Sequence, residues 1–137
     1  MVLVDGRGTP LGLHVDSASP SEMKLLAATL DTVQLDGRRA VPKQLIADKG
    51  YDSNAVRSDL VSRGIEPIIP ARENNRKATH QDGRKLRKYR KRWVVERTNA
   101  WIQNFRRIAM RYERSAEIYT ALVHMACALI VLRLISK

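Results

Sequence analysis

Two short apolar segments separated by one helix-forming segment place the strongest constraint on the fold. Gln44-Leu-Ile-Ala47 is too short for a helix and predicts a buried strand, as does Ile65-Glu-Pro-Ile-Ile-Pro70. Ser53 to Arg63 between them predicts a helix, which Gly64 ends. A strand, a helix and a second strand in this order favour parallel pairing in an α/β fold. Pro67 has no N–H to donate, so the second strand is expected at a sheet edge.

The N-terminal segments add a hairpin and a helix to this pattern. Asp5-Gly6 lies in the turn sequence between the apolar runs Met1–Val4 and Leu11–Val15, which predicts a β-hairpin. Ser19-Pro-Ser-Glu22 has the residues of a capping box and predicts the start of a helix. That helix is expected to end before a turn at Asp36-Gly37.

The C-terminal half predicts two helices after a polar loop. The loop spans Arg72–Asp82, where no apolar period is present, and is expected to be mobile; the first helix spans Lys85 to about Ile108. A final helix from about Glu117 to Ile135 is apolar nearly all round but short for a membrane span, so a buried or partner-packing helix is favoured. Cys127 in this helix predicts a small buried hydrophobe and excludes an internal disulfide. A length of 137 residues fits one domain.

The net charge of +11 is concentrated in one segment of the chain. Arg72 to Arg114 contains fifteen Lys or Arg against four Asp or Glu, whereas the remainder has ten of each sign. A charge needed only for solubility would be spread out, so this segment indicates a surface for a polyanion such as nucleic acid. A solvated helix face is the alternative interpretation. The chain shows no signal peptide, which favours a cytosolic location.

Two carboxylates in this setting predict a metal site. Glu96 is the only acid from Arg84 to Arg97, where eight of fourteen residues are basic. A carboxylate would repel phosphates there unless it held a divalent cation against them. Asp48 follows a predicted strand, where open α/β sheets place functional groups. Alternatively, Asp48 is a turn residue, and Glu96 pairs with Arg92 for only about 0.2–0.5 kcal/mol.

Several blocks of the sequence resemble the DDE-class transposases of bacterial insertion sequences. Leu45-Ile-Ala-Asp48-Lys-Gly-Tyr51-Asp52 is similar to the block around their second aspartate. Tyr89-x-x-Arg92-x-x-x-Glu96 is similar to the Tyr-Arg-Glu signature around their catalytic glutamate. Arg97-Thr-Asn-Ala-Trp101 and Phe105-Arg-Arg107 extend the resemblance in the manner of the insertion sequence five group. The resemblance covers nearly the whole chain.

The resemblance implies a fold and a set of site residues. The fold would be α/β, an RNase H-like (integrase-type) mixed sheet with flanking helices. Asp48 and Glu96 would be catalytic ligands of Mg²⁺ or Mn²⁺, and Tyr89 and Arg92 would position a terminal phosphate. Further DNA contacts would come from the basic segment and the residues after it, namely Arg87, Lys88, Lys91, Arg97, Gln103, Arg106 and Arg107. Gln103 stands where the family often has Lys or Arg, so it adds no charge.

One departure from the family concerns the first of its three acidic ligands. In the family this Asp lies on a strand that precedes the hairpin, and this chain starts inside the hairpin. The expectation is therefore the C-terminal portion of the catalytic domain over residues 1–137, with an incomplete sheet and a metal site short of one carboxylate. Such a chain would be inactive alone, would take the first Asp from an upstream transposase polypeptide, and would form homo-oligomers. It would act on transposon ends and target DNA in the cytoplasm, associated with the bacterial nucleoid and without a membrane. The alternative is a non-catalytic DNA-binding or assembly module, or an inactive remnant.

Overall fold

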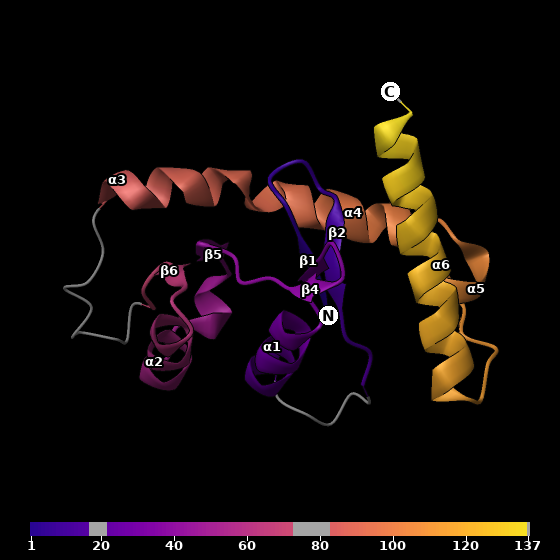
Figure 1. Cartoon of the computed structure of the whole chain (residues 1–137), viewed down its shortest axis with the longest axis horizontal. Helices are drawn as coiled ribbons and strands as arrows, with labels where there is room; N and C mark the ends of the chain where they lie inside the picture. Colours follow the sequence, from indigo (N-terminus) through magenta and orange to yellow (C-terminus); the bar gives the residue numbers. More distant parts are fainter. Residues whose placement is uncertain (17–21, 73–82, 137) are drawn as a thin grey trace. The chain divides into compact units, whose positions relative to one another are not determined.

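The computed structural model describes residues 1–16, 22–72 and 83–136, and the chain divides into two compact units. The first unit contains Met1–Arg39 together with Val94–Lys137, and the second contains Ala40–Trp93. Figure 1 shows the elements of both units along the chain. The assignment of residues 1–137 to a single domain stays a prediction.

The first unit begins with the predicted hairpin. Strand β1 (Val2–Val4) pairs antiparallel with β2 (Pro10–Leu13). Asp5 holds the turn, because its Oδ1 accepts hydrogen bonds from the backbone N–H of Arg7 at 2.8 Å and of Thr9 at 2.9 Å. The interpretation of Asp5 as a turn residue is confirmed.

Helix α1 (Glu22–Asp31) and a small second hairpin follow. Ser19 and Pro20 of the predicted capping box lie outside the described residues. Strands β3 (Gln34–Leu35) and β4 (Arg38–Arg39) pair antiparallel across Asp36-Gly37. Both turn residues have positive φ, 52° and 72°, which is the conformation that a two-residue hairpin turn of type I′ requires. The turn was predicted, but the hairpin around it was not.

The predicted single helix from Lys85 to Ile108 is wrong, because the structure divides this segment into four. These are α3 (Gly83–Leu86), the 3₁₀ helix η2 (Arg87–Arg92), α4 (Trp93–Gln103) and α5 (Arg106–Ala109). Phe105 separates α4 from α5 with an extended backbone, φ −79° and ψ 110°.

A physical reason for the 3₁₀ segment lies in its charges and its one aromatic residue. Like charges four residues apart, such as those of Arg87 and Lys91, disfavour an α-helix. Three residues per turn instead place Tyr89 and Arg92 in one column. The guanidinium carbon of Arg92 lies 5.7 Å from the centre of the Tyr89 ring, a cation–π distance.

The core of the first unit lies between the hairpin, α4 and α6 (Ala116–Ile135). Figure 1 shows α6 in yellow near the end of α4, beside α5. The buried side chains of this core are Leu13, Ile102, Val123, Cys127 and Ile130. Cys127 is a free thiol, as predicted.

A close backbone approach joins the first hairpin to α4. Thr98 is fully buried, and its hydroxyl donates a hydrogen bond to the carbonyl of Gly8 at 2.8 Å. Gly8 has φ +91°, and a Cβ there would lie 2.9 Å from the Thr98 hydroxyl. Glycine therefore satisfies both the backbone conformation and the available space.

Helix α6 combines a buried face with an exposed apolar face. Several large side chains are exposed, namely Ile118, Met125, Leu129, Leu132 and Ile135. By length and mean hydropathy, 2.1, α6 could cross a membrane, and 22% of that window is buried. One such helix is weak evidence for a membrane protein.

The second unit has the predicted strand–helix–strand order. Strand β5 (Gln44–Ile46) pairs parallel with β6 (Glu66–Ile68), and α2 (Asn54–Ser62) connects them after the 3₁₀ helix η1 (Lys49–Tyr51). Ser53 caps α2 by accepting a hydrogen bond from the N–H of Val56 at 3.2 Å. The core consists of Leu45, Val56, Leu60, Ile65, Ile68 and Ile69.

The predicted α/β class and parallel pairing are confirmed at this level. Within the described ranges, the strands form three two-stranded sheets, one parallel and two antiparallel. The single mixed sheet of an RNase H-like fold is not seen in this part of the chain and stays a prediction.

Candidate functional site

Asp48 lies two residues beyond β5 and forms the N-cap of η1. Its Oδ1 accepts a hydrogen bond from the N–H of Lys49 at 2.5 Å. The carboxylate is exposed, and within the described ranges its Oδ2 makes no hydrogen bond. Asp48 therefore has the turn role of the alternative interpretation, and it still presents one oxygen to solvent.

Tyr89 connects the Tyr-x-x-Arg segment to Asp48 within the second unit. Its hydroxyl donates a hydrogen bond to Asp48 Oδ1 at 3.2 Å. Arg92 stacks over the Tyr89 ring. The Tyr-x-x-Arg spacing of the sequence thus places one hydroxyl and one guanidinium beside an exposed carboxylate, a combination that could receive a cation and a phosphate.

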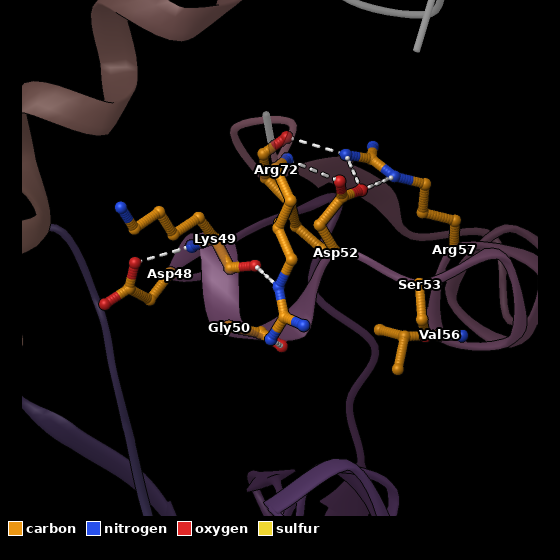
Figure 2. Close-up of polar contacts among 9 residues, drawn as sticks. Asp48, Lys49, Gly50, Asp52, Ser53, Val56, Arg57 and Arg72 are labelled. Atoms are coloured by element: carbon orange, nitrogen blue, oxygen red, sulfur yellow. Dashed lines mark hydrogen bonds and ion pairs between the residues drawn. The ribbon is translucent and has the colours of Figure 1, made fainter. Parts of the chain in front are cut away.

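The segment after Asp48 is held by a buried ion pair (Figure 2). The Asp52 side chain is fully buried, and its Oδ1 accepts a hydrogen bond from Arg57 Nε at 2.9 Å. The same oxygen forms an ion pair with a terminal Arg57 nitrogen at 2.8 Å. Its Oδ2 accepts from the backbone N–H of Arg72 at 2.8 Å. The Arg72 side chain in turn donates to the carbonyls of Lys49 at 2.9 Å and Gly50 at 2.7 Å.

Two of the basic side chains of α3 and η2 contact residues of the parallel strands. Lys85 forms an ion pair with Glu66 of β6, and Lys88 donates to the side-chain carbonyl of Gln44 of β5 at 2.7 Å. The hydrogen bond from Lys85 holds the pKa of Glu66 below its ordinary value. Arg87, Arg90 and Lys91 of η2 are exposed as well.

The other predicted site residues belong to the first unit. Glu96 and Gln103 are exposed on α4. Arg97 donates a hydrogen bond to the carbonyl of Arg7 at 2.5 Å and lies 4.7 Å from the centre of the Trp101 ring. Arg97 thus has a structural role whether or not it binds DNA.

Two exposed arginines lie on α5, the short helix after α4. Arg106 and Arg107 are both exposed, and a terminal nitrogen of Arg107 lies 3.9 Å from a carboxylate oxygen of Glu113. The DNA contacts predicted for both arginines stay predictions.

The donor chemistry of Asp48 and Glu96 fits a divalent cation. Mg²⁺ takes oxygen ligands and is often bound by one or two carboxylates together with substrate phosphates. Both carboxylates are exposed, and Asp48 keeps one oxygen outside its local hydrogen bonds. Within the described ranges, no group of three His, Cys, Asp or Glu side chains could hold a metal by protein ligands alone.

Sequence reasoning missed the side-chain roles of Asp52, Arg57 and Arg72. Asp52 was considered only as the last residue of a family block, and Arg72 only as the start of a loop. The sequence contained part of the signal for the ion pair, because Asp52 lies five residues before Arg57 in the next predicted helix. The twenty-residue separation between Asp52 and Arg72 carries no local pattern.

Comparisons with known proteins agree with the blocks in the sequence. The family model of the transposase DDE domain matches residues 1–131. A relative from Burkholderia cepacia, named "Putative transposase for insertion sequence element IS402", is 40% identical over an alignment of 134 residues, and the match covers 94% of this chain. The chain spans 60% of the length of that relative. No solved structure gives a significant match.

Proposed function

Because the chain belongs to the DDE transposase family, we propose that it serves DNA transposition, with Asp48 and Glu96 as ligands of a divalent cation. The family supports a transposase role and DNA as the partner, and it generally uses a divalent metal. It also suggests a soluble protein of the cytoplasm. The fold proposed for the complete catalytic domain is RNase H-like, and the insertion sequence five group is the proposed subfamily.

One observation carries the proposal. Asp48 presents an exposed carboxylate after the parallel strand β5, and Tyr89 connects it directly to the most basic segment of the chain. A metal ligand and a phosphate-binding surface are needed side by side in phosphoryl transfer, and the second unit contains candidates for both.

The side chains then have separate tasks. Asp48 and Glu96 would hold Mg²⁺ or Mn²⁺, which when bound orients the attacking hydroxyl and stabilises the leaving oxygen. Arg92 would pair with a terminal phosphate, and the Tyr89 hydroxyl would keep the Asp48 carboxylate oriented. Phosphate contacts that carry little sequence information would come from Arg87, Lys88, Lys91, Arg97, Gln103, Arg106 and Arg107.

The second candidate function is a DNA-binding or assembly module without catalysis. The concentration of charge in Arg84–Arg92 favours DNA binding whether or not a cation is held. The catalytic proposal includes two kinds of partner. One is an upstream polypeptide that supplies a third carboxylate, and the other is further copies of this chain in a homo-oligomer. The DNA sequence directly upstream of the reading frame distinguishes a split enzyme from a remnant.

Metal-dependent DNA binding by the full chain tests the catalytic proposal. Fluorescence anisotropy with a labelled DNA duplex would measure the affinity for DNA in Mg²⁺ and in EDTA, at the same ionic strength. Without the cation, the carboxylates repel phosphates, so Asp48→Asn and Glu96→Gln should each bind severalfold more tightly than the native chain in EDTA. In both variants, adding Mg²⁺ should increase the affinity for DNA by less than it does in the native chain.

Matched controls are available in each unit. Asp59→Asn removes an exposed carboxylate of α2, and Glu117→Gln removes one at the start of α6. If the Asp48 and Glu96 variants respond to Mg²⁺ as these controls do, the module without catalysis is the better account. Loss of DNA binding in Glu96→Gln would instead indicate that Glu96 has a structural role.

A further inference from the structure

Asp52 is a buried carboxylate whose partners come from two different segments. Arg57 of α2 donates to Oδ1 and also to the carbonyl of Ile69 at 2.7 Å, just beyond β6. The backbone N–H of Arg72 donates to Oδ2. Both oxygens of Asp52 therefore have partners within the protein, which leaves this acid unsuited to be a metal ligand itself.

Arg72 extends the network to the helix that Asp48 begins. Its side chain donates to the carbonyls of Lys49 and Gly50, two of the three residues of η1. Figure 2 shows these bonds on one side of η1, with the Asp48 carboxylate directed to the other. A single 3₁₀ turn has few bonds of its own, here Tyr51 N–H to Asp48 O at 2.9 Å and Asp52 N–H to Lys49 O at 3.1 Å.

We propose that Asp52 and Arg72 are positioning residues, which fix η1 and thereby direct the Asp48 carboxylate toward a bound cation. The proposal rests on the proposed ligand role of Asp48. Metal and catalytic side chains must be held within about 0.5 Å of their working geometry, and bonds from outside the ligand set supply that rigidity. Asp52 holds Arg57 and the backbone of Arg72 from the core, and the Arg72 side chain holds η1.

The exposed position of Arg72 allows its positioning role to be tested without a large change in the stability of the fold. Arg72 is exposed, so replacing its side chain leaves no buried charge unpaired. Arg72→Lys keeps the positive charge and the backbone bond to Asp52. It loses the planar guanidinium that reaches two carbonyls at once. The variant therefore keeps the charge that attracts DNA but loses the paired hydrogen bonds that hold η1.

Two readouts on the full-length chain test the proposal. Hydrogen exchange reports the amides of Tyr51 and Asp52, and electron paramagnetic resonance reports the affinity for Mn²⁺. Arg72→Lys should accelerate exchange at both amides and weaken Mn²⁺ binding about tenfold, which is the low end for residues that orient metal ligands. Asp52→Asn should change both readouts in the same direction.

Controls and outcomes separate this inference from the proposed function. Arg63→Lys alters an arginine that pairs with Asp59 on α2 at 3.0 Å, and it should leave both readouts at native values. Faster exchange with native Mn²⁺ affinity in Arg72→Lys overturns the positioning role and leaves the ligand role of Asp48 intact. Native Mn²⁺ affinity in Asp48→Asn overturns the proposed function itself.

Discussion

The exposed cations of η2 give the most quantitative prediction for DNA binding. Arg87, Arg90 and Lys91 are exposed on a 3₁₀ helix, where three residues per turn place Arg87 and Arg90 in one column. Replacing all three by Gln removes three positive charges and keeps side chains that can form hydrogen bonds. The variant should bind duplex DNA more weakly and with a smaller dependence on salt.

The size of the effect follows from counterion release. Each phosphate contact contributes about 0.9 to the slope of log affinity against log salt, so three contacts contribute about 2.7. Between about 50 and 200 mM salt, the native chain should therefore lose about 40-fold more affinity than the triple variant.

Fluorescence anisotropy across this salt range measures both slopes. The control is a charge-matched triple variant of exposed cations outside the basic segment: Lys24→Gln, Arg38→Gln and Lys43→Gln. Its slope should stay close to the native slope. Equal slopes for the η2 variant and the control would refute the assignment of the DNA surface to this segment.

The remaining predictions concern stability, reactivity and activity. Gly8→Ala should lower the free energy of unfolding, measured in urea, by more than Gly37→Ala. A left-handed backbone costs either alanine roughly 1–2 kcal/mol. Of the two positions, only Gly8 also has neighbouring atoms within 4 Å of an added Cβ. Burial raises the pKa of Asp5, but hydrogen bonds within its turn outweigh burial and hold that pKa below its ordinary 3.8. The resulting stability is present above 3.8 and lost as pH falls through the folded-state pKa, so acid unfolding curves of Asp5→Asn should lack this component. Burial raises the pKa of the Cys127 thiol, so iodoacetamide should label it slowly until the chain is unfolded. Because the described residues hold no group of three acidic or His/Cys ligands, Asp48 and Glu96 alone should not support cleavage or joining of transposon-end DNA with Mg²⁺, and detection of either product would contradict this expectation.

Local signals predicted the elements whose start and end are set by neighbouring residues. The Asp5-Gly6 turn predicted the first hairpin, and Ser53 and Gly64 predicted both ends of α2. Capping and turn formation depend on contacts within about four residues, so the sequence displays them directly.

Contacts between distant residues could not be predicted in the same way. The 3₁₀ helix at Arg87–Arg92 contains no Gly or Pro that would mark it, and its Tyr89–Asp48 bond joins residues 41 positions apart. The resemblance implied a DNA contact for Arg97, but no nearby residue indicated that its side chain also donates a hydrogen bond to the carbonyl of Arg7, 90 positions away. Charge and spacing alone do not reveal which cation has a partner within the fold.

Cleavage of the polypeptide by bound iron tests the central claim most directly. Fe²⁺ in place of Mg²⁺, with ascorbate and peroxide, generates hydroxyl radicals that cut the backbone beside the ion, and mass spectrometry locates the cuts. If Asp48 and Glu96 hold one cation in the presence of DNA, cuts should appear beside both residues, decrease with added Mg²⁺, and disappear in Asp48→Asn. Cuts beside neither residue, or a pattern unchanged in that variant, would contradict a shared metal site.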